Sequence, residues 1–199
     1  MKTEYEVKFV DVDIDAVRRQ LQDVGAVLVK PMRLMRRAII ENPEMKTKNA
    51  FVRVRDEGDR VTLTYKQFTE LSVEGAKEYE VVVNDFDETV ALLAAAGMPY
   101  GSLQESKRET WHYEDAEIVI DVWPWLNPYI EIESISVEKV KAFSERLGFA
   151  WETAVFGDVM AAYRVQYPHL KESDTVARIA EVKFDDPLPG LLAMHDKPA

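Results

Sequence analysis

Apolar and charged residues alternate along several short segments of this chain. The segments 3–10, 50–57 and 60–67 each alternate with a period of two, which is typical of a β-strand because successive side chains point to opposite faces. Gly58-Asp59 lies between the second and third segments and predicts a turn, so these two segments are expected to form a hairpin. The same reasoning predicts further strands at 26–40, 77–83, 103–114, 116–123 and 128–134.

Helices are predicted where apolar residues recur every three or four positions behind a capping residue. This pattern occurs at about 14–24, 86–96, 136–147 and 158–166, and a glycine follows each of the first three, as it does at many helix ends. Residues 42–49 are predicted to be a polar loop. Residues 174–184 have no clear pattern, and residues 187–199 are expected to be a loop or a frayed terminus.

Length and composition favour one globular domain. The chain has 199 residues, of which 47% are hydrophobic, and this is enough for one sizeable core. No low-complexity segment or linker divides it. We therefore expect a single domain over residues 1–199, with a core at about 1–167 and a C-terminal extension at 168–199.

Charge and cysteine content narrow the classes of function. The formal net charge is −11, and no basic run of five residues offsets it, which argues against nucleic acid or an anionic membrane as partner. With no cysteine and three histidines, a metal would be bound mainly by oxygen, as Mg²⁺, Mn²⁺ and Ca²⁺ are. The chain shows no apolar signal segment or stretch of 18 apolar residues, so a cytoplasmic protein is expected.

The charged positions of six predicted strands fall on one face of each strand. One explanation is an antiparallel sheet whose charged face is in water. The alternative is a sheet that curls around its charged faces, because the predicted helices need the apolar faces to pack on, and such a sheet encloses a polar tunnel. The positions are Glu4/Glu6/Lys8, Arg53/Arg55, Thr62/Thr64/Lys66, Glu78/Glu80, Asp121 and Glu131/Glu133.

A tunnel with clustered acids and clustered bases favours a polyanion and divalent cations as ligands. Buried charges must be paired or must coordinate ions. Arginine and lysine bind phosphate oxygens, while carboxylates hold the metal that bridges them. This combination is typical of phosphoryl transfer, in which positioning and charge neutralisation dominate.

The chain also resembles a known family. Glu4-Tyr5-Glu6-Val7-Lys8 is similar to the ExExK signature of the CYTH superfamily, also called triphosphate tunnel metalloenzymes. The resemblance covers about residues 1–150 and implies an α+β fold: an eight-stranded antiparallel closed β-barrel, the triphosphate tunnel, with helices packed outside. The similar segments that follow in order are Phe51-Val52-Arg53-Val54-Arg55, Thr64-Tyr65-Lys66, Glu78-Tyr79-Glu80-Val81, Lys107-Arg108-Glu109, Ile120-Asp121-Val122-Trp123 and Tyr129-Ile130-Glu131-Ile132-Glu133.

The resemblance implies roles for the charged residues. Asp121 is similar to an acid near the reacting phosphate, and the catalytic candidates are Lys8, Asp121 and Arg55. The residues expected to bind the phosphates are Lys8, Arg53, Arg55, Lys66 and Arg108. The acids expected to hold Mg²⁺ or Mn²⁺ are Glu4, Glu6, Glu80, Glu131 and Glu133.

One position departs from the family pattern. The family often shows Lys-x-Arg where this chain has Ser106-Lys107-Arg108, so one phosphate contact is in question. Trp123 and Trp125 either stack on the nucleobase of a ligand or, as is more common, pack at a strand end. The candidates to supply the missing basic side chain are Arg33, Arg36 and Arg37, which are equally well explained as residues facing solvent. Lys183 is a separate candidate to reach the tunnel from the C-terminal segment.

Four functions remain open on the sequence. The leading one is a metal-dependent phosphohydrolase acting on inorganic triphosphate, thiamine triphosphate or a nucleoside triphosphate. A class IV adenylyl cyclase, which converts ATP to cyclic AMP and pyrophosphate, needs the same tunnel. The others are a non-catalytic module that binds triphosphate or polyphosphate and a structural barrel with a solvated charged face. The expected partner is a triphosphate-containing small molecule, and the expected state is a monomer or homodimer.

Overall fold

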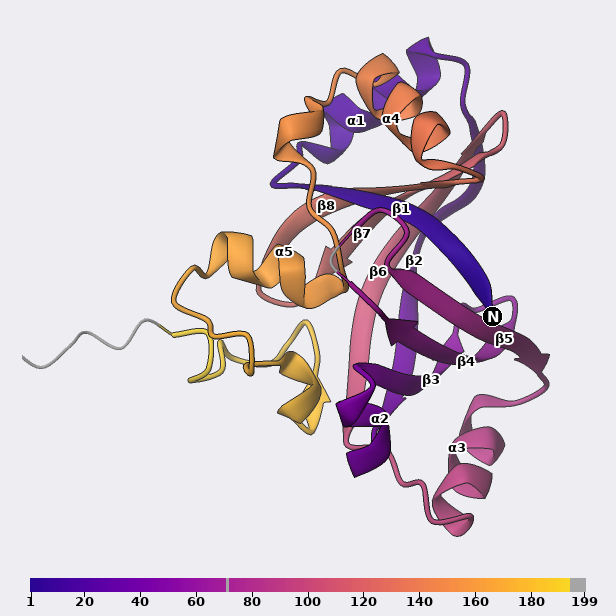
Figure 1. The fold of residues 1–199 in the computed structure, drawn as a ribbon, viewed down its shortest axis with the longest axis vertical. Helices are drawn as coiled ribbons and strands as arrows, with labels where there is room; N and C mark the ends of the chain where they lie inside the picture. The colour runs from indigo at the N-terminus through magenta and orange to yellow at the C-terminus, as the bar shows by residue number, and fades with distance from the viewer. Residues whose placement is uncertain (71, 194–199) are drawn as a thin grey trace, which may run out of the picture.

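The computed structural model describes residues 1–70 and 72–193 (Figure 1). The positions below confirm the predicted strands and longer helices, with boundaries that differ by a few residues. The strands are β1 (Lys2–Val10), β2 (Val27–Ile40), β3 (Ala50–Asp56), β4 (Val61–Phe68), β5 (Ala76–Val83), β6 (Ser102–Tyr113), β7 (Ala116–Trp123), β8 (Leu126–Ser134) and β9 (Glu181–Val182). The helices are α1 (Ile14–Asp23), α2 (Pro43–Thr47), α3 (Phe86–Ala95), α4 (Val137–Arg146) and α5 (Val159–Gln166), with 3₁₀ turns at Trp151–Thr153 and Val176–Arg178.

Eight of the strands close into a barrel. Their order is β2-β3-β4-β5-β1-β8-β7-β6, and β2 also pairs with β6, so the ring has no free edge. Each of these pairs is antiparallel, which confirms the predicted fold. β9 adds a short parallel pairing beside the start of β6.

Two short elements differ from the sequence-based expectation. α2 forms where a loop is predicted, because the Asn42 side chain accepts a hydrogen bond from the Met45 amide and Pro43 occupies the first helical turn, where its missing N–H is not needed. The segment 174–184, which has no clear pattern, contains the 3₁₀ turn Val176–Arg178 and β9.

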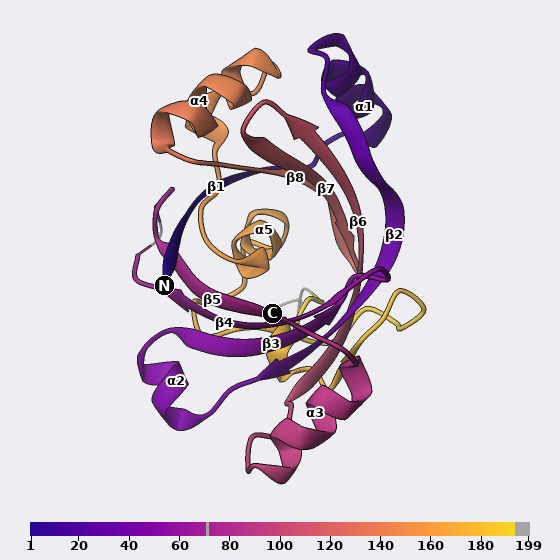
Figure 2. The ribbon, with the colours of Figure 1, turned by 90° about the vertical axis from the view of Figure 1, so that its right-hand side faces the viewer.

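Helices cover much of the apolar outer face of the barrel. In the view along the barrel, α1, α3 and α4 lie outside the ring of strands (Figure 2). Residues of β1, β7 and β8 such as Val7 and Ile132 pack with Leu21 of α1 and Phe143 of α4. None of the helices in the described ranges is long and apolar enough to cross a membrane.

The outer face of β5 is an exception to this coverage. Tyr79 is 62% exposed and Val81 is 56% exposed, although the alternation predicts that helices pack on this apolar face. α3, the helix that follows β5, instead packs its Phe86 and Leu93 against Ala38 and Val54. The turn between β5 and α3 therefore directs the helix over β2 and β3.

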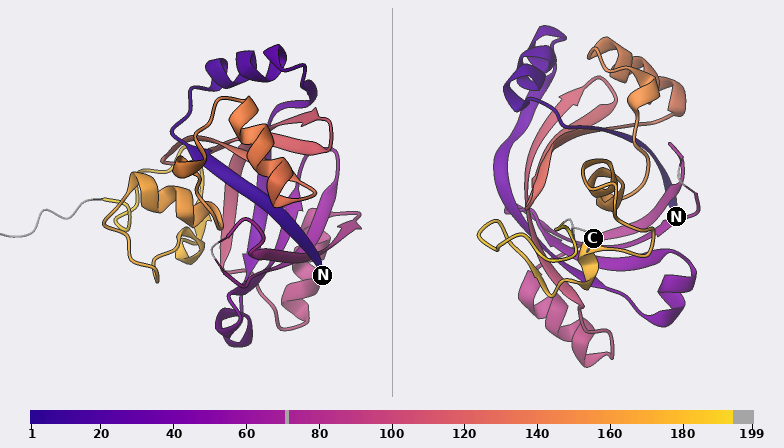
Figure 3. Two further views of the ribbon diagram at one scale, coloured as in Figure 1. Left: turned by 45° about the horizontal axis from the view of Figure 1, so that its top comes forward. Right: turned by 90° about the vertical axis from the view of Figure 1, so that its left-hand side faces the viewer.

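One end of the barrel is closed by the segment that follows α4. α5 lies across the opening of the ring of strands (Figures 2 and 3). Met160 and Tyr163 of α5 are buried with Trp123 and Tyr129 of the barrel, and Val176 joins the same cluster. The barrel interior is therefore bounded at this end by residues that lie outside its strands.

Candidate functional site

The inward faces of the strands surround a cavity of about 580 Å³. Glu6 and Lys8 are almost fully buried, so the charged faces point into the barrel, and the alternative of a solvated charged face is wrong. Of the residues predicted from the family resemblance, those that line the cavity are Glu4, Glu6, Lys8, Arg53, Arg55, Lys66, Glu80, Arg108, Glu131 and Glu133.

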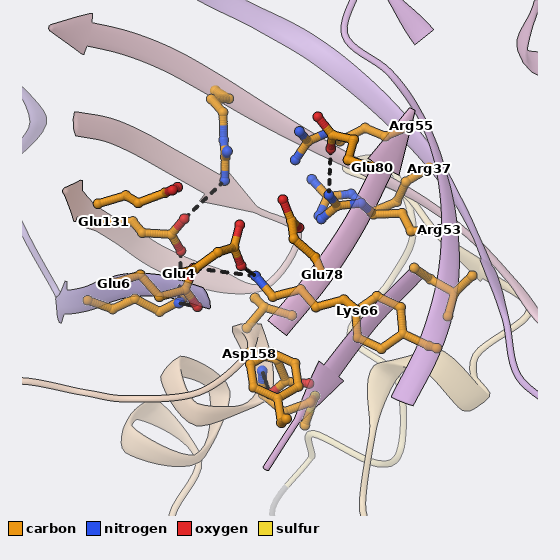
Figure 4. A pocket seen from close by; sticks show the side chains of 18 of the residues that line it. Glu4, Glu6, Arg37, Arg53, Arg55, Lys66, Glu78, Glu80, Glu131 and Asp158 are labelled. Carbon is orange, nitrogen blue, oxygen red and sulfur yellow. Dashed lines mark hydrogen bonds and ion pairs between the residues drawn. The ribbon is translucent and has the colours of Figure 1, made fainter. Parts of the chain in front are cut away.

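Acidic and basic side chains of the cavity come mainly from different strands, and the two groups meet where Arg53 Nη2 lies 3.8 Å from Glu80 Oε2 and Arg108 Nη2 lies 3.8 Å from Glu131 Oε1. Lys66 of β4 projects between the two groups (Figure 4). The adjacent strands β6, β2 and β3 form what we call the basic wall, which consists of Arg108, Arg37, Arg53 and Arg55. The adjacent strands β5, β1 and β8 form the acidic wall, which consists of Glu78, Glu80, Glu4, Glu6, Glu131 and Glu133.

Two lysines form ion pairs with carboxylates of the acidic wall. Lys8 Nζ lies 2.8 Å from Glu131 Oε2 and 3.3 Å from Glu6 Oε1. Lys66 Nζ lies 2.7 Å from Glu4 Oε2 and 3.4 Å from Glu6 Oε2. Burial opposes the charge of Lys8, but Glu131 and Glu6 outweigh it and raise its pKa above the ordinary value. Lys8 is therefore a fixed cation at neutral pH.

Other carboxylates of the acidic wall have too little positive charge nearby to offset their mutual repulsion. Burial and the nearby Glu4 raise the pKa of Glu78 to about 7, and the same two causes raise the pKa of Glu133. A divalent cation would relieve this repulsion, and oxygen ligands suit Mg²⁺ or Mn²⁺. No three acidic or histidine side chains converge as a ready metal cage within residues 1–70 and 72–193, so the fit rests on donor chemistry and charge.

Asp121 lies behind Arg108 and not at the cavity surface. It is fully buried. Its carboxylate accepts hydrogen bonds from Arg108 Nε at 2.7 Å and Arg108 Nη2 at 2.6 Å, and a third from the Tyr129 hydroxyl at 3.0 Å. This arrangement fixes the orientation of the Arg108 guanidinium, which lines the cavity.

The structure distinguishes the candidates that could replace a basic side chain at position 106 by where each one lies. Arg37 lines the cavity. Arg36 forms ion pairs on the outer surface, and Arg33 donates to backbone carbonyls beside the cavity. Lys183 pairs with the neighbouring Glu181 outside the barrel and is not among the residues that line the cavity.

Both tryptophans pack at strand ends. The Arg37 guanidinium carbon lies 4.3 Å from the centroid of the Trp123 ring. The Trp125 indole donates to the Asp186 carbonyl at 2.9 Å, which ties the C-terminal segment to the barrel. Trp123 also lines the cavity, whereas Trp125 is not among the lining residues.

The acids assigned to the metal in the sequence-based prediction leave out Glu78, and that prediction gives no role to Glu57. Glu78 lines the cavity, as its alternation with Glu80 in Glu78-Tyr79-Glu80 predicts. Glu57 lies just beyond β3, is 3% exposed, and forms ion pairs with Arg55 and Arg60. Its position at a turn gives no such signal, because only the fold brings the cations around it.

Glu57 is expected to contribute stability that is lost in acid. Burial alone would raise its pKa, but Arg55 and Arg60 outweigh burial and lower it to about 2. Because the folded value lies below the ordinary value of about 4.3, the contribution is complete above that pH and is lost as the pH falls towards 2. Glu57→Gln should therefore cost about 2–3 kcal/mol at pH 7.

Urea denaturation of the wild type and Glu57→Gln between pH 3 and 7 tests this expectation. The difference in unfolding free energy should shrink as the pH falls. Asp59→Asn, at the neighbouring exposed carboxylate, is the matched control and should change stability much less. A difference that stays constant across this range would contradict the assigned role.

The comparisons with known proteins agree with this geometry. The sequence matches the CYTH domain over residues 2–153. No curated protein sequence matches the chain. The matched residues include all eight barrel strands and both charged walls, while the lining residues 158–160 and 175–177 lie beyond the match.

Three solved structures illustrate the likeness in fold. The PH1012 protein of Pyrococcus horikoshii OT3 is 21% identical, with 76% of this chain and 93% of that chain covered and a TM-score of 0.65. A candidate adenylate cyclase of Vibrio parahaemolyticus is 10% identical, with 80% and 96% covered and a TM-score of 0.70. HpAC1 of Hippeastrum is 15% identical, with 82% and 96% covered and a TM-score of 0.57. Barrel topology and the sequence match over residues 2–153 thus lead to one conclusion, that this chain belongs to the CYTH family.

Proposed function

We propose that this protein hydrolyses a triphosphate inside the barrel, with Mg²⁺ or Mn²⁺ as cofactor. One observation carries the proposal: a basic wall and an acidic wall line the same cavity of the barrel. A polyanion together with a divalent cation neutralises both walls at once. Membership of the CYTH family, whose members are triphosphatases or adenylyl cyclases, supports an enzyme.

The basic wall is suited to bind the phosphate chain. Guanidinium groups bind phosphate oxygens through paired N–H donors. The buried Nε atoms of Arg53 and Arg55 have no hydrogen-bond partner among the described residues, so each guanidinium keeps an unsatisfied donor at the cavity wall. Arg108 is oriented by Asp121, and Lys66 adds a point charge between the walls.

The acidic wall is suited to hold the cation. When bound, the metal would neutralise phosphate charge and activate the attacking water. Lys8 keeps its proton between Glu131 and Glu6, so its catalytic contribution is electrostatic and it does not act as a base. The residues proposed to hold the metal are Glu4, Glu6, Glu80, Glu131 and Glu133, with Glu78 beside them.

A product assay tests the proposal and separates it from its alternatives. Inorganic triphosphate, thiamine triphosphate and ATP would each be incubated with Mg²⁺ and with Mn²⁺, and the products separated by chromatography. HpAC1, named as an adenylyl cyclase, has a dominant triphosphatase activity, so both kinds of product must be measured. Orthophosphate is expected. Cyclic AMP with pyrophosphate would instead assign a class IV adenylyl cyclase, and binding without turnover a non-catalytic module.

Ligand binding is also expected to stabilise the fold. Inorganic triphosphate with Mg²⁺, at about 100 times its dissociation constant, should add about 2.7 kcal/mol to the unfolding free energy. Either component alone should add less, because it neutralises one wall only. Thermal unfolding with both, with each and with neither measures this effect. An unfolding temperature that both together leave unchanged would contradict the proposal.

A further inference from the structure

Arg37 lies at the centre of the basic wall. Its strand, β2, lies between β6, which carries Arg108, and β3, which carries Arg53 and Arg55. The residue is 6% exposed and lines the cavity. Figure 4 shows its side chain beside those of Arg53 and Arg55. Arg37 is thus surrounded by residues of its own charge.

Arg37 lacks the carboxylate partner that its neighbours have. Its one side-chain hydrogen bond within the described ranges goes to the neutral Ser106 hydroxyl, with Nη2 and Oγ 2.6 Å apart, and its Nε has no partner. Arg108, in contrast, is paired with Asp121, and Arg55 is paired with Glu57. A buried cation without a counter-charge is unfavourable, and an anionic ligand would supply that charge.

The surroundings of Arg37 penalise its charge. Burial, followed by repulsion from Arg53, Arg55 and Arg108, lowers the pKa of Arg37 to about 9. The side chain is still protonated at neutral pH, so the repulsion persists in the free protein. An anion between these guanidiniums would turn mutual repulsion into shared attraction.

Two contacts fix the position of Arg37. Its guanidinium lies over the Trp123 ring, and stacking of this kind uses the face of the group and leaves its N–H edge for hydrogen bonds. The Ser106 hydroxyl holds one end of that edge. Trp123 packs with Met160 and Val176, so Arg37 lies towards the closed end of the cavity.

From this geometry we propose that Arg37 directly binds a phosphate group of the substrate, and specifically the group nearest the closed end of the barrel. This inference rests on the proposed function. It also explains how the site binds phosphate without a basic side chain at position 106. The neighbouring strand supplies the charge, and Ser106 orients it. Arg37 therefore extends the basic wall so that it favours a three-phosphate chain over a two-phosphate chain.

The test is equilibrium binding of inorganic triphosphate and of pyrophosphate, measured by calorimetry in EDTA so that metal-dependent hydrolysis is absent. Arg37→Met keeps an aliphatic stem on Trp123 and removes the charge. It should weaken triphosphate binding about 10- to 100-fold, the usual effect of losing a charge-assisted contact. Pyrophosphate binding should change much less, so the preference for triphosphate should fall.

Two further variants isolate the cause. Ser106→Lys in the Arg37→Met background places an ammonium in the same space, because Ser106 Oγ is already 2.6 Å from the Arg37 side chain, and it should restore most of the affinity. Arg36→Met is the matched control: it removes the adjacent arginine, whose ion pairs lie outside the barrel, and should leave both affinities unchanged. The unfolding temperature of Arg37→Met should equal or exceed that of the wild type, since an unpaired buried charge is lost.

The outcomes distinguish this inference from the proposed function. If the wild type binds triphosphate and Arg37→Met binds it equally well, the inference is wrong and the proposed function stands. Equal weakening for both ligands, with a lowered unfolding temperature and no recovery in the double variant, would show that Arg37 only packs the wall. If the wild type does not bind triphosphate even with Mg²⁺, the proposed function fails, and the inference fails with it.

Discussion

Replacing Glu131 and Glu133 together by glutamine is expected to abolish metal-dependent turnover of a triphosphate while the barrel stays folded. Both residues lie on β8 within the acidic wall, and an amide is a much poorer ligand for a hard cation than a carboxylate. Turnover should fall at least about 100-fold. The fold should survive because Lys8 keeps its second partner, Glu6, at 3.3 Å.

The measurement is orthophosphate release with Mg²⁺ and with Mn²⁺, beside a circular dichroism spectrum of the same sample. Glu145→Gln with Glu152→Gln is the matched control, because it removes the same formal charge from two exposed positions outside the barrel. That control should retain wild-type turnover. Full activity in a folded Glu131→Gln/Glu133→Gln protein would refute the assignment of the acidic wall to the metal.

The largest effect on stability is expected from Asp121→Asn. Asp121 is fully buried, and its carboxylate accepts three hydrogen bonds, two of them from Arg108. The amide of an asparagine would present an N–H group to a donor, and Arg108 would keep only the more distant Glu131, at 3.8 Å, as counter-charge. Breaking a buried ion pair in this way costs about 3–5 kcal/mol.

Urea denaturation at neutral pH measures this cost. Tyr129→Phe removes only the third hydrogen bond and should cost about 1 kcal/mol, so the two variants form a graded pair. Asp23→Asn, at an exposed position in α1, controls for the loss of formal charge and should be close to neutral. Triphosphate binding should weaken in Asp121→Asn as well, since Arg108 loses its fixed orientation. If Asp121→Asn lowers the unfolding free energy no more than Asp23→Asn does, the Asp121–Arg108 pair does not stabilise the fold as proposed.

Much of the barrel follows from local pattern. Alternation with a period of two sets which side chains share a face, whatever the strand later pairs with. This is why Glu4 and Glu6, or Arg53 and Arg55, enter the same cavity in the structure as in the sequence-based prediction. Family membership likewise follows from the order of short motifs, which the match over residues 2–153 confirms.

The partner of each charged side chain depended on the tertiary structure. Alternation places Asp121 and Arg108 on inward faces, but the register of β6 with β7 sets them opposite each other, so that one covers the other. In the same way, Glu57 follows a strand as an ordinary turn residue, and only the fold surrounds it with Arg55 and Arg60.

For Arg37, too, the sequence sets the alternation of side chains and the tertiary structure sets its partners. The residues Arg36 and Arg37 are adjacent, and the sequence by itself determined only that they point to opposite faces of a strand. Closure of the barrel by pairing of β2 with β6 decided that Arg37 is the inward one and that Ser106 lies beside it. The segment after residue 153 has no strong alternation, and its place across the barrel end depends on Met160 and Val176 packing on Trp123. Contacts between residues so distant in the chain leave no periodic signal, because periodicity reports the face of an element and not its neighbour.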